Sequence, residues 1–160
     1  MKIAIITDTH AGARGDSLVF NEYFMRFWEN VFFPHLEENN IKQVLHLGDV
    51  VDRRKFINFV TLNSWRTRFF DRMRNDGITM DVIVGNHDVT YKNTNEINAM
   101  DELFHGYENI NVYKSPVEKI YGDKQFALVP WINSGNYQES LKFLNDTKSK
   151  IVFGHFEIAG

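Results

Sequence analysis

The stretch VIVGNHDV, residues 82–89, joins an apolar run directly to a glycine and three polar residues. Val82, Ile83 and Val84 are typical of a buried strand. Because a glycine lets the backbone turn sharply, Gly85 predicts where that strand ends. The polar side chains that follow would then lie at its carboxyl end, where they serve either a turn or a bound ligand.

Three further apolar runs end in residue types that bind metals. They are KIAIIT (2–7), followed by Asp8 and His10; QVLHLG (43–48), followed by Asp49 and Asp52; and KIVFG (150–154), followed by His155. In an α/β sheet, ligands bind outside the carboxyl ends of the strands. The four runs therefore predict one site, to which Asn86 of the opening stretch also belongs.

The chemistry of these residue types favours a pair of divalent cations. Asp8 and His10 are two residues apart, so they point the same way on an extended segment. Asp49 offers two oxygens and can bridge two ions, Asn86 offers a carbonyl oxygen, and His155 an imidazole. Oxygen and nitrogen ligands without sulfur favour manganese, iron or zinc over magnesium or calcium. Two such ions ~3.5–4 Å apart form the clamp used for phosphoester hydrolysis.

His87 differs from its neighbour Asn86, because a second residue of the same turn cannot easily reach the same metal. It is better placed to face the substrate, where an imidazole can stabilise charge on a phosphate or protonate a leaving oxygen. Asp52 could accept a hydrogen bond from His87 and fix its orientation. The pattern thus predicts His87 and Asp52 as catalytic residues.

Composition bounds the class of protein. The 160 residues are 43% hydrophobic and 14% aromatic, which predicts one globular domain. The net charge of −3 gives no indication of nucleic-acid binding, which usually shows as an excess of basic residues, although bound metals can supply positive charge locally. The absence of cysteine excludes disulfides and thiolate metal sites. No run approaches the roughly 20 apolar residues that span a bilayer, so we expect a cytoplasmic protein with no membrane partner.

The periodicity of the chain predicts a layered α/β fold with a mixed sheet or sheets. Helical spacing of apolar residues, or a cap or stop signal, predicts helices over residues 17–39, 57–77, 95–104 and 137–145. Residues 109–131 are typical of successive antiparallel strands, with Gly122 and Asp123 forming a hairpin turn.

The series DTH (8–10), GDVVD (48–52), GNHD (85–88) and GH (154–155) resembles the motifs of the calcineurin-like metallophosphoesterase superfamily. Each motif alone is weak, but together they cover nearly the whole chain. The resemblance implies a β-sandwich flanked by helices. It also implies that Asp8 and His10 hold one metal, that Asn86 and His155 hold the other, and that Asp49 bridges both. By the same resemblance His87 faces the substrate and Asp52 orients it.

Within the superfamily, IAIITDTHAG (3–12) and VLHLGDVVDRR (44–54) are most similar to the nuclease subunit of SbcCD-type recombination and repair complexes. This similarity implies a manganese-dependent DNA exonuclease and endonuclease, a homodimer, and an ABC-type ATPase partner with long coiled coils. A phosphatase or cyclic-nucleotide phosphodiesterase would share the same ligands. A non-catalytic dimerisation module is a third interpretation.

The superfamily's last motif, Gly-His-X-His, does not occur in the sequence. Two histidine ligands of the family pattern therefore have no counterpart, one for each metal. We expect residues 1–160 to be the N-terminal part of a metallophosphoesterase domain that also has a capping domain. We further expect this part to bind metals weakly and to have little activity.

Other residues allow a structural interpretation beside a functional one. His46 lies between two leucines and is more typical of a hydrogen-bonded core histidine than of a ligand. The arginines and lysine of residues 53–74 fit a solvated helix face, although Arg53 is close enough to the site to touch a phosphate. Phe56, Phe59 and Val60, with the apolar residues of 97–104, fit either core packing or a dimer interface.

Overall fold

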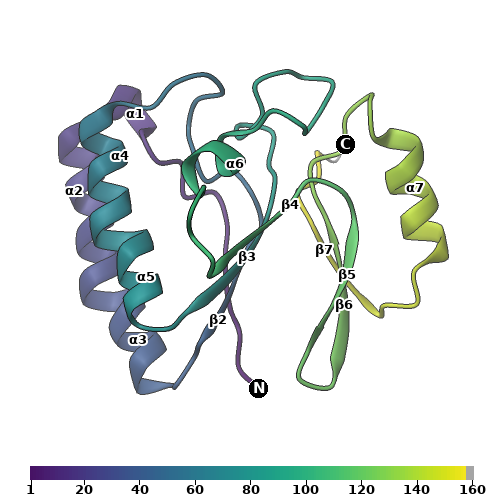
Figure 1. Ribbon diagram of the computed structural model, residues 1–160, viewed down its shortest axis with the longest axis horizontal. Coiled ribbons are helices and arrows are strands. Elements are labelled where there is room, and N and C mark those ends of the chain that lie inside the picture. Colours follow the sequence, from purple (N-terminus) through teal and green to yellow (C-terminus); the bar gives the residue numbers. More distant parts are fainter. Residues whose placement is uncertain (158–160) are drawn as a thin grey trace.

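The computed structural model describes residues 1–157, so the end of the domain expected over 1–160 lies outside the described residues. The strands form two sheets, which face each other in Figure 1. The first sheet has the order β1 (Ala4–Ile6), β2 (Gln43–His46), β3 (Thr79–Ile83), β4 (Ile110–Tyr113). The second has the order β5 (Val117–Tyr121), β6 (Lys124–Val129), β7 (Ile151–Gly154).

Helices cover the outer side of each sheet (Figure 1). The first sheet is covered by two long helices that each contain a π-helical turn. They run through α2 (Leu18–Phe27), η1 (Trp28–Phe32) and α3 (Phe33–Glu38), and through α4 (Phe59–Trp65), η2 (Arg66–Phe70) and α5 (Asp71–Asn75). The shorter elements are α1 (Ala13–Asp16), α6 (Ala99–Leu103) and α7 (Tyr137–Asp146), of which α7 covers the second sheet. The layered α/β fold with a β-sandwich flanked by helices is therefore confirmed.

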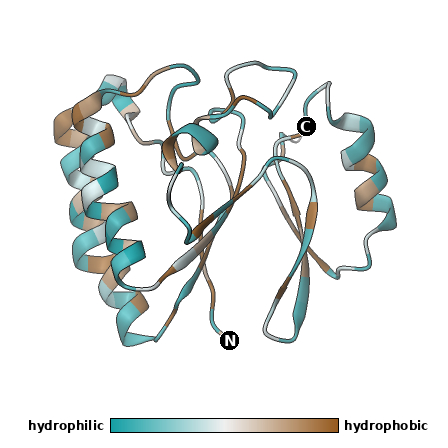
Figure 2. Ribbon diagram, in the orientation of Figure 1, coloured by the Kyte–Doolittle hydropathy of each residue, from teal (hydrophilic) through white to brown (hydrophobic). Residues whose placement is uncertain are grey.

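The alternation of side chains along the strands builds two apolar layers. Val44, Met80 and Val82 pack with the aromatic faces of the long helices. Leu45 and Ile83, which point the other way, pack against Leu128 of the second sheet. Figure 2 shows hydrophobic residues along these strands. Because the central strands are buried on both faces, their carboxyl ends are held firmly in place.

The structure differs from the prediction in the pairing of one strand and in the length of one helix. Residues 109–131 were expected to form antiparallel strands, but β4 pairs with β3 in parallel, and only β5 and β6 form the antiparallel hairpin with its turn at Gly122. The helix expected over 95–104 is shorter, because Asn98 caps α6 through its side chain, which accepts from the backbone N–H of Asp101. Residues 95–98 form a loop whose buried Asn95 binds backbone carbonyls instead.

None of the helices within residues 1–157 combines the length and the hydropathy that a membrane span requires.

Candidate metal centre

The loops after β1 and β2 lie side by side and are hydrogen-bonded to each other. The backbone N–H of Asp8 donates to the Gly48 carbonyl, and that of His10 donates to the Asp49 carbonyl, each at 3.1 Å. Asp8, His10 and Asp49 have φ angles of 53°, 42° and 55°. Non-glycine residues rarely adopt this left-handed conformation, which costs about 1–3 kcal/mol per residue and clusters at functional sites. The backbone is therefore strained at three of the predicted ligands.

The predicted ligand atoms converge around Asp49, whose side chain is buried. Asp49 Oδ2 lies 3.9 Å from His10 Nε2 and 3.5 Å from His155 Nε2. His10 Nε2 is in turn 3.5 Å from Asp8 Oδ1. Asp8, Asp49 and His155 can offer three ligand atoms that all lie within 4.8 Å of one another. The carboxyl ends of β1 and β2 in one sheet and of β7 in the other thus deliver side chains to one point.

His155 brings the second sheet into the site. Its Nδ1 lies 2.8 Å from the Leu47 carbonyl, which can only accept, so Nδ1 carries a hydrogen and Nε2 points toward the ligand cluster. Nε2 is 2.8 Å from Asn86 Oδ1. Burial lowers the pKa of His155, but the Asp49 carboxylate outweighs that effect and raises it to about 9. A positive charge is therefore favoured at the point where the oxygens of Asn86 and Asp49 face the imidazole.

Two glycines let these loops approach closely. Gly48 has a φ of 96°, and a Cβ there would lie 2.8 Å from both Gly85 Cα and His155 Nδ1. A Cβ on Gly85 would lie 2.3 Å from both the backbone nitrogen and Oδ1 of Asp49. These separations are far below van der Waals contact, so each position requires a residue without a side chain.

Asp88, for which the sequence predicts no role, joins the strand ends to one another. Its fully buried carboxylate accepts hydrogen bonds from the backbone N–H groups of Asp49, Val50, Val51 and Gly85, at 2.8–3.1 Å. Burial raises the pKa of Asp88 to about 6, against these donors, which favour the ionised form. Asp88 therefore fixes the backbone on either side of Asp49. Its place directly after His87 is the only sequence signal for this role.

His87 and Asp52 lie together, but in a different way from the prediction. His87 Nδ1 is 2.6 Å from the main-chain carbonyl of Asp52, and the Asp52 carboxylate lies 3.6 Å from His10 Nδ1 instead. The His87 backbone N–H donates to Asp49 Oδ1 at 2.8 Å. The rings of His10 and His87 meet edge to face with centroids 5.0 Å apart. His87 can also form a three-residue ligand group with His10 and Asp49.

His46 is a core histidine within a continuous hydrogen-bond chain. The Gly48 N–H donates to His46 Nδ1 at 3.2 Å, so Nε2 carries the hydrogen and donates to Thr9 Oγ1 at 3.0 Å. Thr9 in turn donates to the Val50 carbonyl. Burial lowers the pKa of His46 to about 3. The neutral imidazole therefore braces the loop after β1 against the loop after β2, directly beneath the ligand cluster.

The residues present fit a divalent metal centre. The cluster brings carboxylate and amide oxygens and an imidazole nitrogen within a few ångströms of one another, and divalent cations could accept electron pairs from all of these groups. Asp8, His10, Asp49, Asn86 and His155 are the residues that would hold metal. When bound there, divalent ions act as Lewis acids toward a phosphoryl oxygen and supply a nucleophile at neutral pH.

A sandwich of two sheets whose joined carboxyl edges gather oxygen and imidazole ligands is the architecture of a metal-dependent phosphoesterase. Residues 1–159 match the calcineurin-like phosphoesterase family, and the chain belongs to that family. The chain is 31% identical to exonuclease subunit 1 of Enterobacteria phage T4, over all of this chain and 47% of that protein. It is 28% identical to putative phosphoesterase 078R of Invertebrate iridescent virus 3, over 87% of this chain and 41% of that protein.

The solved structures include a similar fold. The crystal structure of Pseudomonas putida nuclease MPE superposes with a TM-score of 0.50 at 23% identity, over 79% of this chain and 52% of that one. This likeness supports the fold. The chain spans about half the length of the curated relatives it matches.

Proposed function

We propose that the chain carries the two-metal site of a phosphodiester hydrolase, and that the protein is a DNA exonuclease and endonuclease subunit. The observation that carries this proposal is the convergence of ligand atoms from both sheets on the buried Asp49. In the proposed assignment Asp8 and His10 hold one ion, Asn86 and His155 hold the second, and Asp49 bridges them. Manganese is the proposed metal, since the ligand set mixes oxygen with imidazole nitrogen.

The proposed role of His87 is to face the phosphate. Because Nδ1 donates to the Asp52 carbonyl, Nε2 is the nitrogen that can hold a proton for the departing oxygen. Asp52 is then a positioning residue, which acts on His87 through its carbonyl. Its carboxylate, near His10 Nδ1, would orient that ring as a metal ligand.

The test compares diesters with monoesters. The full-length protein is assayed with manganese on linear duplex DNA, single-stranded DNA and bis(p-nitrophenyl) phosphate, and in parallel on p-nitrophenyl phosphate. We expect the diesters to be cleaved, and His87→Gln to lower their kcat by roughly 10²–10⁴-fold. Manganese binding by calorimetry should be unchanged in His87→Gln and lost in Asp49→Asn. Preferred cleavage of the monoester would identify a phosphatase instead, and unchanged DNA cleavage by His87→Gln would overturn the catalytic assignment.

We further propose a homodimer, built through an exposed apolar patch on the two long helices. This patch, the α2/α4 patch, consists of Leu18, Val19, Tyr23, Phe59 and Val60, which are 56–85% exposed. Figure 2 shows hydrophobic residues at this end of the helices. The two helices are joined there by the hydrogen bond from Asn21 to Ser64. The apolar residues of 97–104 differ in exposure: Met100 and Phe104 are buried in the core, whereas Ile97 is exposed.

Sedimentation velocity tests the dimer. We expect Val19→Asp to give a monomer, because a charge in a closed apolar interface is costly. Ile120→Asp is the matched control, since Ile120 is 70% exposed on β5, outside the patch. A wild-type protein that sediments as a monomer at high concentration would contradict the proposal.

The proposed biological setting is DNA recombination and double-strand-break repair, with an ABC-type ATPase partner that has long coiled coils. The name of the phage T4 relative, exonuclease subunit 1, supports a nuclease that works with a second subunit. In that case DNA cleavage should depend on ATP once the ATPase is present. Cleavage that stays independent of ATP in the assembled complex would contradict this role.

A further inference from the structure

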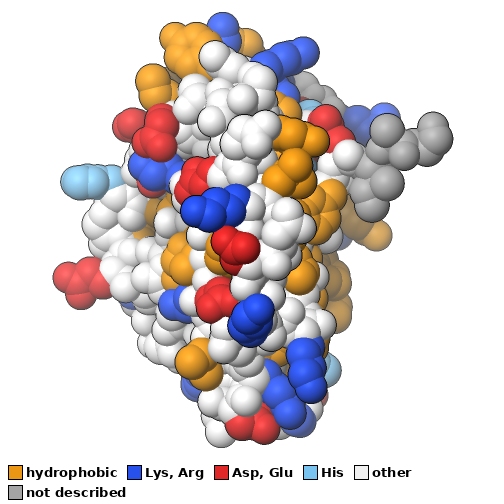
Figure 3. All heavy atoms as spheres, turned by 90° about the vertical axis from the view of Figure 1, so that its right-hand side faces the viewer, with side chains coloured by type: hydrophobic (Ala, Val, Ile, Leu, Met, Phe, Trp, Pro, Cys, Tyr) orange, Lys and Arg blue, Asp and Glu red, His pale blue; other side chains and the backbone are white. Residues whose placement is uncertain are grey.

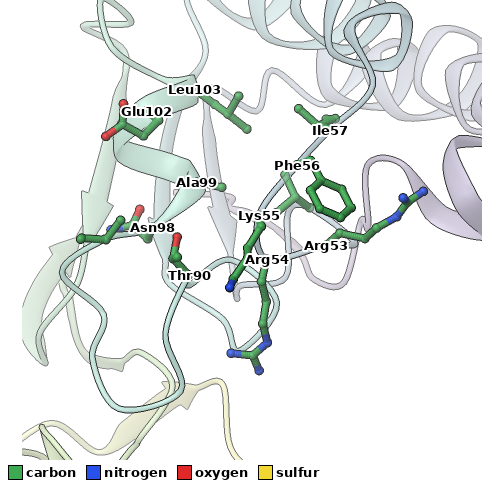
Figure 4. A pocket seen from close by; sticks show the side chains of 12 residues that line it. Arg53, Arg54, Lys55, Phe56, Ile57, Thr90, Asn98, Ala99, Glu102 and Leu103 are labelled. Atoms are coloured by element: carbon green, nitrogen blue, oxygen red, sulfur yellow. The ribbon is translucent and has the colours of Figure 1, made fainter.

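A pocket opens beside the candidate metal centre, between the segment after β2 and helix α6 (Figure 4). Its volume is about 200 Å³. Apolar side chains form much of its wall, namely Val51, Phe56, Ile57, Ile97, Ala99 and Leu103. Sites for drug-sized ligands have volumes of roughly 300–1,000 Å³. This pocket therefore suits a single flat ring system rather than a larger ligand.

Two unpaired cations border this pocket. Arg53 is neutralised by Asp16, whose Oδ2 lies 2.8 Å from its Nη2. Arg54 and Lys55, by contrast, have no carboxylate within 4.0 Å in the part of the chain that the structure describes. In Figure 4 these two side chains extend in the same direction, and the carboxylate of Glu102 points away from them. The pair therefore presents positive charge to an incoming anion.

Arg54 is held on a rigid support. Its guanidinium lies over the ring of Trp131, 5.6 Å from the centroid. The backbone N–H of Trp131 donates to the Val84 carbonyl, and the backbone carbonyl of Trp131 accepts hydrogen bonds from the side chains of Asn95 and Asn136, both at 3.0 Å. Trp131 is itself buried. The guanidinium is thus preorganised, so that little conformational entropy is lost when an anion binds.

The pocket shares part of its wall with a second hollow, which is beside His87. The second hollow is lined by His87 and Asp52 together with residues 53–56, which also line the pocket. Arg54, Lys55 and Phe56 therefore lie on the wall between the two hollows, and the ring of Phe56 is 67% exposed with the Arg53 guanidinium 5.6 Å from its centroid. On the face of the molecule that carries α7, acidic and basic side chains are interspersed (Figure 3), so no single-sign surface competes there.

We propose that this pocket holds the base of the nucleotide next to the scissile phosphate of an unpaired DNA strand, with that base against Phe56 and the adjoining phosphate on Arg54 and Lys55. This inference rests on the proposed nuclease function and narrows it to polynucleotides. A phosphomonoester or a small aryl diester has no second phosphate and cannot use these cations. A base can use the aromatic wall in any sequence, because every base has a π-face.

The test measures binding without metals, and so without cleavage. A fluorescein-labelled oligothymidylate is titrated with protein in EDTA over a series of salt concentrations, and anisotropy gives Kd. We expect Arg54→Gln to raise Kd by about tenfold. We also expect it to lower the slope of log Kd against log salt concentration by the amount that corresponds to about one phosphate contact. Phe56→Ala should raise Kd by roughly 5–150-fold with an unchanged salt slope, since stacking is lost and charge is kept.

Two further variants control for charge and fold. Arg54→Lys keeps the charge and should retain the salt slope. Lys150→Gln removes an exposed charge just before β7, at the end of the strand away from His155, and should bind as the wild type does. Light scattering of Phe56→Ala checks that the oligomeric state is unchanged; a shift to monomer would assign Phe56 to a protein interface and overturn the proposal.

The outcomes separate this inference from the proposed function. Wild-type affinity in both Arg54→Gln and Phe56→Ala, or no binding of the oligonucleotide by the wild type at millimolar concentration, overturns the pocket whether or not DNA is cut. If the variants weaken binding as expected but no DNA is cleaved with manganese, the nucleotide pocket stands and the nuclease assignment fails.

Discussion

The buried His46 should make the free energy of unfolding depend on pH in a way that one substitution removes. Its pKa is about 3 in the folded protein, against a reference value of 6.5. As the pH falls below 6.5, His46 binds a proton in the unfolded chain but stays neutral in the folded protein. The free energy of unfolding therefore decreases until the pH reaches about 3. Between pH 7.5 and 5.0 this single group should cost about 2 kcal/mol, at 1.36 kcal/mol per unit.

Urea unfolding in EDTA at the two pH values measures this effect, with His46→Gln as the comparison. A glutamine side chain can still accept from Gly48 and donate to Thr9, but it does not titrate near these pH values. Because other titrating groups are the same in both proteins, their contributions cancel in the difference. We expect the wild type to lose about 2 kcal/mol more than His46→Gln between pH 7.5 and 5.0. Equal losses in the two proteins would refute a neutral, proton-excluding His46.

Three other substitutions test the site and its frame. Gly85→Ala places a Cβ on Asp49, 2.3 Å from its Oδ1, and should weaken manganese binding by at least tenfold in calorimetry; wild-type affinity would show that the loops can separate. Asp88→Asn leaves backbone donors of the Asp49 loop without full partners and should cost about 2–4 kcal/mol in urea unfolding at pH 8, whereas a loss below 1 kcal/mol would deny it a structural role. Tyr121→Phe removes the 2.6 Å hydrogen bond to the buried Asp81 and should cost about 1.5–3 kcal/mol, and an unchanged midpoint would argue that water replaces the hydroxyl.

The strand ends could be predicted because their signal is local. An apolar run followed by a ligand-type residue predicts both where a strand ends and which side chain lies at its end. In the structure Asp8, His10, Asp49 and His155 do lie close together. The partner of β4 could not be predicted in this way. The sequence of a short strand such as residues 110–113 does not show whether it pairs with the preceding strand or the following one, and in the structure it pairs with β3 in parallel.

The roles of single atoms were predicted less well. Asp52 was expected to orient His87, and it contacts that residue through its carbonyl, an atom that every residue has and that no sequence pattern marks. Asp88 was left without a role because nothing in the sequence marks a carboxylate that serves the backbone, and in the structure it accepts hydrogen bonds from four backbone N–H groups. Thr9 and His46 form their chain across 37 residues of sequence, so only the pairing of β1 with β2 reveals it.

The strained backbone at Asp8, His10 and Asp49 explains why the site needs so large a frame. Three left-handed residues cost several kcal/mol together by the range given above, so the surrounding structure has to offset that cost. The compensation comes from beneath, where Asp88 binds the Asp49 loop and His46 joins that loop to Thr9. A strained loop held by buried hydrogen bonds cannot relax when a ligand leaves, so the carboxylates stay close together despite their mutual repulsion. The site is therefore preorganised to bind positive charge. Its affinity for metal should depend as much on these buried hydrogen bonds as on the ligands themselves.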